Sequence, residues 1–238
     1  MHAEAGEEAV YIWHASLDAP IPVACEGWLD RDERRRAQGR RFEVDRARFV
    51  ASHALLRAVL GKAIGVAPWD VSFNQNEYRK PELAAACHSG TPRVHFNLAH
   101  SGSRALVAVA YGRRVGVDIE IVARQYEELR EVTQRFSERE RLAIDRLPPR
   151  EATEAFYRCW VRKEALLKGI GIGLLGNVGT FSVDICSSAS QQITLPLESG
   201  AAWTLLTLDH VDEPFKYMAA LAVEGAPLPI VQREWSWE

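Results

Sequence analysis

Residues 156–174 read FYRCWVRKEALLKGIGIGL, and this stretch sets the expectation for both the fold and the site. Its apolar residues recur at helical spacing, so one face of the helix should be buried. The helix should end at Gly169, which crowds the charged groups of Lys163, Glu164 and Lys168 into its last turn. An ordinary surface pair between Glu164 and Lys168, worth about 0.3 kcal/mol, explains the same spacing. Other parts of the sequence must show whether these charged groups form a functional site or an ordinary solvent-exposed surface.

The composition limits the class of protein. The chain has 238 residues, of which 47% are hydrophobic, enough for one large domain or two of modest size. A formal net charge of -3 gives no electrostatic reason to expect nucleic acid as the main ligand. No apolar run approaches membrane-spanning length, and the first residues are acidic where a signal peptide needs positive charge. We therefore expect a cytosolic (cytoplasmic) protein without a membrane partner.

The cysteines indicate no metal knuckle and no disulfide framework. Cys25, Cys87, Cys159 and Cys186 are widely scattered without a CxxC pair, so we interpret them as reduced and structural. Cys87 beside His88 is the one pattern that resembles a nucleophile. A reactive thiol needs a defined electropositive setting, and the alanines and glycine around this pair do not supply one.

The first part of the chain combines a strand with a basic helical region. Residues 9–14 alternate like a strand, residues 20–22 form a loop, and Asp30 with Glu33 has the pattern of a capping box. Residues 49–64 should form an amphipathic helix. Residues 30–57 hold nine arginines against five acids, either as a solvated face or as a phosphate-binding surface. The arginines that suit a phosphate are Arg34, Arg35, Arg36, Arg40, Arg41, Arg46 and Arg48.

Two polar residues in the next segments have defined positions. Residues 69–83, WDVSFNQNEYRKPEL, read as a strand and a turn in which Pro81 restricts Lys80. Residues 84–92 should form a surface loop. Residues 93–112, RVHFNLAHSGSRALVAVAYG, read as two strands around a turn at residues 100–102. His100 beside serine and glycine suits an anion, although hydrogen bonding to the turn backbone explains it equally well.

A pair of acids interrupts the next strand. Residues 114–122, RVGVDIEIV, are otherwise apolar, and strand alternation places Asp118 and Glu120 on the same face. Two carboxylates on one face repel each other, so they need a cation or a solvated edge. Mg²⁺ takes hard oxygen ligands, which makes a Mg²⁺ site the sharper hypothesis.

The second part of the chain should repeat the element order of the first. Helices are expected at residues 126–133, 137–145 and 151–168, and strands near 180–186, 203–208 and 215–223. Ser137 and Glu140 form another capping-box pattern, which accounts for Glu140 without a role in a site. The glycines of residues 169–179 follow a helix, the reverse of a dinucleotide or Walker loop, so we reject both nucleotide motifs. The order indicates an α+β fold of two similar halves, 1–113 and 114–238, with the site between them.

Several motifs together resemble a known family. FNLAHSG (96–102), VGVDIE (115–120) and the stretch at 156–174 occur in the order and at the separations found in Sfp-type 4'-phosphopantetheinyl transferases. EYRKP (77–81) and the arginine-rich RRF segment resemble upstream motifs, so the resemblance covers most of residues 31–174. It implies a pseudo-dimer of two α+β halves with coenzyme A in the cleft between them, acting as a monomer. It also implies transfer of the 4'-phosphopantetheine arm to a serine of an apo acyl- or peptidyl-carrier protein, releasing adenosine 3',5'-bisphosphate.

The resemblance also implies roles for individual residues. Asp118, Glu120 and Glu164 would hold Mg²⁺ on the coenzyme A diphosphate. Glu164, or a water on the metal, would accept the serine proton. Lys163 and Lys168 would contact the phosphates, and Glu164, Lys168 and Asp118 form the implied catalytic set. The 3'-phosphate and adenine end would be held by His100, Lys80 and part of the arginine cluster, with Arg35 and Arg41 included.

The chain departs from the family pattern at three positions. It has Ala99 where serine is common, Arg79 where glycine is common, and Gln38 where a basic residue is usual. These departures concern the adenine and 3'-phosphate contacts and leave the acids intact.

Two rival functions remain. A Mg²⁺-dependent nuclease would use similar acids, but the net charge and the single compact arginine cluster do not favour it. A carrier-binding module with a decayed site is the second rival, and the presence of all three acids and both lysines argues against decay.

Overall fold

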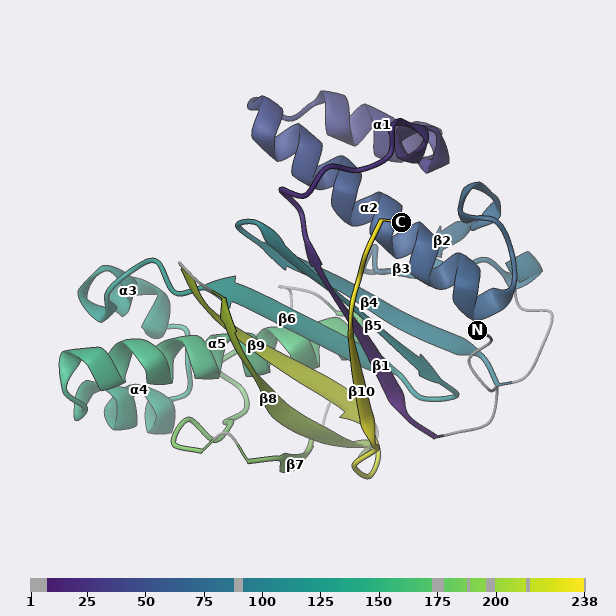
Figure 1. Cartoon of the computed structure of the whole chain (residues 1–238). Coiled ribbons are helices and arrows are strands. Elements are labelled where there is room, and N and C mark those ends of the chain that lie inside the picture. Colours follow the sequence, from purple (N-terminus) through teal and green to yellow (C-terminus); the bar gives the residue numbers. More distant parts are fainter. Residues whose placement is uncertain are drawn as a thin grey trace. The chain divides into compact units, whose positions relative to one another are not determined.

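The computed structural model describes residues 8–87, 92–172, 178–187, 189–195, 200–212 and 215–237. The chain folds into two compact units, each combining helices with a four-stranded sheet (Figure 1). Unit 1 comprises Met1–Asn76, Pro81–Arg113 and Leu228–Glu238, and unit 2 comprises Glu77–Lys80 and Arg114–Pro227. The predicted α+β fold of two halves is confirmed. The units differ from the expected halves, 1–113 and 114–238, in the assignment of residues 77–80 and 228–238.

The sheet of unit 1 has the strand order β10-β1-β5-β4. β4 and β5 form an antiparallel hairpin, β1 pairs antiparallel with β5, and β10 runs parallel to β1 with Val10 opposite Ile230. The expected turn at residues 100–102 is shifted, since His100 and Ser101 still belong to β4. The strands are β1 (Val10–Ser16), β4 (Val94–Ser101), β5 (Arg104–Tyr111) and β10 (Ile230–Glu234), with the separate pair β2 (Phe73–Gln75) and β3 (Pro81–Leu83).

In the described residues of unit 1, two α-helices and three short 3-10 helices accompany the sheet. In α1 (Arg31–Gln38), Asp30 and Glu33 form the predicted capping box. Helix α2 (Glu43–Ile64) begins six residues earlier than expected, because its first turn carries Glu43 and Asp45, which interact favourably with a helix N-terminus. It ends at Gly65, whose φ of 74° is the left-handed conformation that glycine accommodates. The 3-10 helices are η1 (Val23–Trp28), η2 (Pro68–Asp70) and η3 (Ala85–Cys87).

A buried arginine joins α1 to α2. Arg57 is almost fully buried, and its guanidinium lies 2.7 Å from Glu33 and 2.9 Å from Asp30. It also donates to the backbone oxygen of Val71 at 2.8 Å. The capping box of α1 therefore has a second function as the anion that neutralises Arg57.

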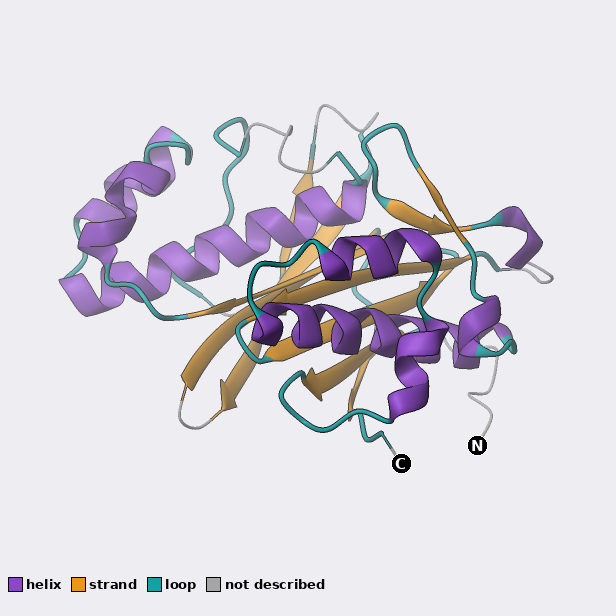
Figure 2. Ribbon diagram, turned by 90° about the horizontal axis from the view of Figure 1, so that it is seen from above, coloured by secondary structure: helices purple, strands orange, loops and turns teal. Residues whose placement is uncertain are grey.

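Unit 2 has an antiparallel sheet of order β6-β9-β8-β7 and one long helix, α5. Helix α5 packs against β6 and β9 (Figure 2). Helices α2 and α5 each span 22 residues, and in each unit this long helix packs against strands of the sheet. No helix in the described parts of the chain is long and apolar enough to cross a membrane. The elements are β6 (Val115–Ile121), α3 (Tyr126–Thr133), α4 (Glu138–Asp145), α5 (Pro149–Ile170), β7 (Gln191–Thr194), β8 (Ala202–Asp212) and β9 (Phe215–Glu224).

The expected strand near residues 180–186 is wrong. The described residues 178–187 contain no strand, whereas the strands expected near 203–208 and 215–223 are present as β8 and β9. Side chains of α4 and α5 bind the backbone groups that a strand would have paired. These contacts are Arg158 to Ile185 O (2.7 Å), Arg162 to Asp184 O (2.7 Å), Lys163 to Val178 O (2.6 Å) and Phe181 O (2.5 Å), and Val183 N to Glu140 (2.7 Å).

Candidate active site

Strand β6 and helix α5 bring an acid and a lysine together. Asp118 lies in β6 and is 3% exposed, and its Oδ1 is 2.5 Å from Nζ of Lys168 in the last turn of α5. Glu164, one helical turn before Lys168, is also buried. Glu120 follows Asp118 by two positions in the same strand and therefore shares its face. The structure thus collects three carboxyl groups and one ammonium, which we call the acid–lysine cluster.

The electrostatics of this cluster show that its acids are poorly compensated. Burial raises the pKa of Asp118 to about 7, with Lys168 opposing the change and Glu120 and Glu164 adding to it. Burial also raises the pKa of Glu164, again against the effect of Lys168 and with that of Glu120. Burial alone would lower the pKa of Lys168, but the carboxylates of Asp118, Glu164 and Glu120 raise it. Lys168 therefore stays charged and only partly compensates the acids.

Two oxygens of the cluster have no hydrogen-bond partner. Oδ2 of Asp118 and Oε1 of Glu164 are buried and unpaired among the described residues. Buried polar atoms without a partner are rare because their desolvation is costly. No group of three His, Cys, Asp or Glu residues in the described ranges is arranged to hold a metal ion by itself. Mg²⁺ is usually held by one or two carboxylates together with substrate phosphates, and the unpaired oxygens suit that kind of site.

Two glycines allow β6 and α5 to touch. A Cβ on Gly116 would lie 2.0 Å from Ala165 O and 2.3 Å from Gly169 N. A Cβ on Gly169 would lie 2.7 Å from the Trp203 ring. The backbones of the strand and the helix are therefore in direct contact. This contact is two residues from Asp118 and one from Lys168.

The expected phosphate contact of Lys163 does not hold in this structure. The side chain is completely buried, and its Nζ lies 2.8 Å from Glu140 while it donates to Val178 O and Phe181 O. An ammonium with these three partners and no exposure has no place for a ligand. Lys163 neutralises Glu140 and fixes residues 178–181 instead.

Glu140 is more than the helix cap that the sequence indicated. The capping box with Ser137 is present at the start of α4. The same carboxylate also pairs with Lys163 and accepts the backbone N–H of Val183. Sequence reasoning missed this pair because its members are far apart in the chain and the cap already explained Glu140.

Lys80, which the sequence assigned to the 3'-phosphate end, contacts backbone carbonyls of α5 and β6 in this structure. Its Nζ donates to Gly169 O at 2.9 Å and to Val115 O at 3.5 Å, all within unit 2. The preceding Arg79 has a φ of 66° and is the one non-glycine residue with positive φ among the described residues. This conformation explains why glycine suits the position where the chain departs from the family pattern.

Unit 1 gathers a second, cationic group of residues around Phe49. Arg36 and Arg40 lie over the Phe49 ring at 5.5 and 4.9 Å, and the His53 ring stacks on it at 3.8 Å. Burial, Arg36 and the nearby His100 lower the pKa of His53 to about 3, so this imidazole is neutral. We call Arg36, Arg40, Phe49, His53 and His100 the basic–aromatic cluster. The sequence analysis identified Arg36, Arg40 and His100 as candidate ligand contacts. It did not identify Phe49 or His53, because their positions were explained by the amphipathic helix expected at residues 49–64.

Arg35 and Arg41, the two arginines singled out for the 3'-phosphate, lie in exposed positions. Arg35 pairs with Asp32 at 2.5 Å and is largely exposed, and Arg41 lies 5.3 Å from the Phe42 ring. Arg35 also lines a hollow of about 630 Å³ together with Arg31, Asp32, Arg34 and Gln38. The Gln38 departure therefore lies within a surface that is still rich in arginine.

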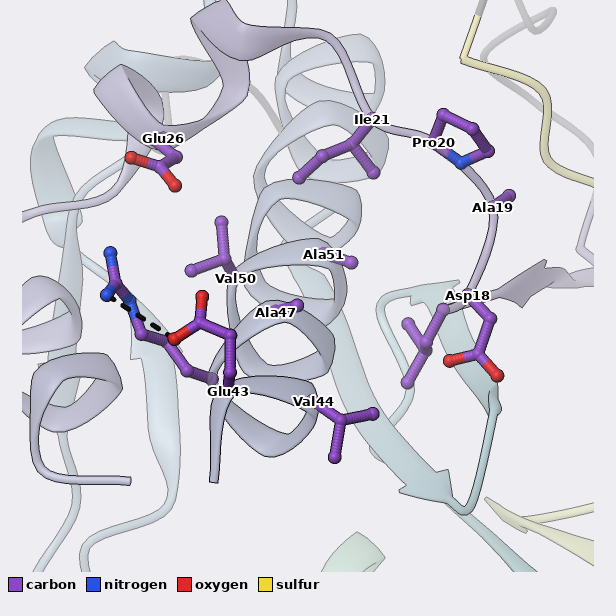
Figure 3. Close-up of a pocket in the computed structure, with 12 residues that line it drawn as sticks. Asp18, Ala19, Pro20, Ile21, Glu26, Glu43, Val44, Ala47, Val50 and Ala51 are labelled. Atoms are coloured by element: carbon purple, nitrogen blue, oxygen red, sulfur yellow. Dashed lines mark ion pairs between the residues drawn. The ribbon is translucent and has the colours of Figure 1, made fainter. Parts of the chain in front are cut away.

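A cavity of about 380 Å³ in unit 1 belongs to neither cluster. It lies between the segment that follows β1 and the first turns of α2, where Asp18, Ile21 and Val50 are among its lining residues (Figure 3). Of the arginines that suit a phosphate, Arg46 lines this cavity, whereas the proposed Mg²⁺ ligands and His100, Lys80, Arg35 and Arg41 do not. His88, the expected neighbour of Cys87 in a thiol site, lies outside the described residues, and Cys87 is a free thiol.

Comparison with known proteins agrees with these motifs. Residues 114–222 match the family model described as 4'-phosphopantetheinyl transferase superfamily, and residues 22–111 match the model described as 4'-phosphopantetheinyl transferase, N-terminal. The chain is 33% identical to the 4'-phosphopantetheinyl transferase HetI of Nostoc sp., over 92% of this chain and 89% of the relative. It is 32% identical to a 4'-phosphopantetheinyl transferase of Bacillus subtilis, over 89% of this chain and 92% of the relative. It is 27% identical to the L-aminoadipate-semialdehyde dehydrogenase-phosphopantetheinyl transferase of Xenopus laevis, over 82% of this chain and 65% of the relative. The chain therefore belongs to the 4'-phosphopantetheinyl transferase superfamily.

Proposed function

We propose that this protein transfers the 4'-phosphopantetheine arm of coenzyme A to a serine of an apo acyl- or peptidyl-carrier protein and releases adenosine 3',5'-bisphosphate. The acid–lysine cluster supports this function, because it carries two unpaired buried carboxylate oxygens within residues 114–222, which match the superfamily model. We expect a monomeric, cytosolic enzyme.

The reaction needs one proton acceptor and stabilisation of the leaving group. The serine oxygen attacks the phosphorus that bears pantetheine, and the bond from that phosphorus to the bridging oxygen breaks. The electron pair leaves on the bisphosphate, and we assign the serine proton to Glu164. Its burial raises the pKa of Glu164, which makes it a better base near neutral pH. We assign Lys168 to the diphosphate, where its charge offsets the charge that develops on the bridging oxygen.

We propose Asp118, Glu120 and Glu164 as the residues that hold Mg²⁺ with the diphosphate. Their oxygens are the ligands that this ion prefers. When bound, Mg²⁺ would supply neutralisation of the diphosphate charge and polarisation of the phosphoryl group. Asp118 would offer its unpaired Oδ2 to the ion, while Oδ1 keeps its pair with Lys168.

We assign the 3'-phosphate end of coenzyme A to the exposed cations of unit 1. His100, Arg35 and Arg41 remain the proposed contacts, and Arg36 and Arg40 of the basic–aromatic cluster are added. Replacing His100 or Arg41 with alanine should weaken use of coenzyme A more than use of 3'-dephospho-coenzyme A. A charge-assisted phosphate contact is worth about 1.5 to 3 kcal/mol, so the two co-substrates should differ by about tenfold or more. Equal losses with both co-substrates would contradict the assignment.

The function is tested by incubation of the protein with Mg²⁺, coenzyme A and a panel of apo acyl- and peptidyl-carrier proteins. Intact mass measurement should show addition of one arm to the carrier, and mutation of the acceptor serine to alanine should abolish it. A reaction with EDTA in place of Mg²⁺ tests the metal requirement separately. If no carrier in a broad panel gains the arm, the proposed function is wrong.

A further inference from the structure

Residues 77–80 come from the N-terminal part of the sequence but belong to unit 2. Within this segment, Lys80 donates a hydrogen bond to the backbone carbonyl of Gly169. We propose that Lys80 is a positioning residue that holds the last turn of α5 against the start of β6 and so sets the geometry of the acid–lysine cluster. Its catalytic consequence rests on the proposed function, whereas its structural consequence does not.

Val115 O and Gly169 O, which accept from Lys80, are on the two elements that carry the cluster. Gly169 is in the last turn of α5 and Val115 is the first residue of β6. The last carbonyls of a helix lack intrahelical partners and carry partial negative charge, so an ammonium interacts favourably with them. The Gly171 N–H satisfies the Leu167 carbonyl, and Lys80 supplies a donor to the Gly169 carbonyl. One side chain therefore bridges the helix end and the strand start.

The Lys80 contact lies where the backbones of β6 and α5 are in direct contact, so their spacing cannot decrease. Gly116, directly after Val115, meets Gly169 and Ala165 without room for a Cβ, and a Cβ on Gly169 would lie 2.7 Å from the Trp203 ring. Gly116 and Asp118 point to the same face of β6 because they are two residues apart. Lys168 directly precedes Gly169. A small separation of the helix from the strand at this contact would therefore be transmitted to the 2.5 Å pair between Lys168 and Asp118.

The backbone around Lys80 fixes its direction. Pro81 restricts the conformation of Lys80, and Arg79 has a left-handed φ of 66°. After Pro81 the chain enters β3 and returns to unit 1. Lys80 is thus presented by a constrained turn, as a positioning contact requires and as a freely mobile surface lysine would not be.

The test uses Lys80→Met, which keeps the length of the side chain and removes its charge and donors. The control is Lys216→Met, since Lys216 also belongs to unit 2 and pairs with Glu154 at the surface. Lys80→Met should speed hydrogen–deuterium exchange in peptides covering residues 163–171 and 115–120. Lys216→Met should leave exchange in these peptides as in the wild type. Unchanged exchange in Lys80→Met would overturn the positioning role, whatever the enzyme activity.

Kinetics separate positioning from direct recognition of the 3'-phosphate. For Lys80→Met we expect kcat/KM to fall about 10- to 100-fold, equally with coenzyme A and with 3'-dephospho-coenzyme A, because a misplacement of about 1 Å costs up to about 100-fold. The Mg²⁺ concentration for half-activation should rise. A loss confined to coenzyme A would instead show that Lys80 reads the 3'-phosphate and would overturn the proposal.

A second variant covers failure of the first to fold. Lys80→Arg keeps donors that reach the two carbonyls, so it should retain exchange protection and more activity than Lys80→Met. If a folded Lys80→Arg exchanged in the peptides covering residues 163–171 and 115–120 as fast as Lys80→Met, the proposal would be contradicted. If the wild-type protein modifies no carrier, the proposed function fails, while the exchange measurement still decides whether Lys80 holds α5 against β6.

Discussion

The buried pair of Glu140 and Lys163 gives a sharp test of the structure, because the family resemblance assigned Lys163 to the phosphates. The perturbation is a cycle of Glu140→Gln, Lys163→Met and the double variant. Glutamine keeps the size of the side chain and can act in a capping box, but Glu140→Gln replaces one acceptor oxygen with an amide donor as well as removing the charge. The two oxygens accept from Ser137 N and Val183 N, so part of the cost comes from a lost backbone hydrogen bond. Both side chains are almost fully inaccessible, so each single change leaves the other charge buried without its partner.

The expected magnitude follows from this burial. Breaking a buried pair from one side costs about 3 to 5 kcal/mol, whereas removing both charges costs much less than the sum of the two changes. For a chain of this length each kcal/mol shifts the unfolding midpoint by about 2 to 4 °C, so each single variant should melt roughly 6 to 20 °C lower. The double variant should be no less stable than the worse single variant. The surface pair of Lys216 and Glu154 is the control, with a cost of at most about 1 kcal/mol.

The assay combines thermal unfolding with turnover measured below the lowest midpoint. If Lys163 is purely structural, the double variant should turn over within a few-fold of the wild type. If Lys163 contacts a phosphate, loss of a charge-assisted contact worth about 1.5 to 3 kcal/mol should reduce kcat/KM about 10- to 150-fold in the double variant as well. Additive destabilisation, or a large loss of turnover without loss of stability, would refute the structural role.

Three further predictions concern the acids and the strained turn. Glu164→Ala and Asp118→Ala should each reduce carrier modification at least 100-fold, and high Mg²⁺ should restore part of the activity. The double variant should show no further loss, because each single change already disrupts the cluster. Turnover of Glu164→Ala within a few-fold of wild type at limiting Mg²⁺ would contradict the proposed cluster. Burial raises the pKa of Asp118 to about 7 from its ordinary value of 3.8, so the folded state binds the carboxyl proton more tightly than the unfolded state does. The stability that this proton confers is fully present below the unfolded pKa and is lost as the pH rises to about 7. Melting in EDTA should therefore show that Asp118→Asn gains stability relative to the wild type between pH 4 and about 8, and a constant difference across this range would count against the raised pKa. Arg79→Gly should raise the free energy of unfolding by about 1 kcal/mol in chemical denaturation, since it removes backbone strain at a φ of 66°. A destabilised variant would show that the Arg79 side chain makes a contact worth more than the strain.

Local sequence patterns predicted most elements of the fold because those elements have strong periodicity. Helix α5 carries apolar residues at helical spacing and strand β6 is an apolar run interrupted by two acids, and the bounds of both lie close to the expected ones. Residues 178–187 were predicted wrongly because their backbone partners are side chains of α4 and α5. Such contacts depend on packing between distant segments, which a local pattern does not contain.

The candidate site was predictable only where spacing along one element was sufficient. Asp118 and Glu120 follow from strand alternation, and Glu164 with Lys168 follows from helical spacing. The burial of Lys163 had a signal that was overlooked: it lies four residues after Cys159 and three before Leu166, on the apolar stripe of α5. Its partner Glu140, like the contact of Lys80 with Gly169, joins segments far apart in the chain, and one sequence gives no means of pairing them.

The parallel pairing of β10 with β1 affects how the chain can fold during synthesis. Val10 has its partner Ile230 only after the whole of unit 2 has been translated. Until then, one side of β1 is an unpaired strand edge that another chain can join. Unit 2 is contiguous apart from residues 77–80 and can begin to form while that edge is still open. The open edge of β1 thus exposes a nascent chain to aggregation, and a chaperone that shields β1 on the ribosome would protect it until the last strand is synthesised.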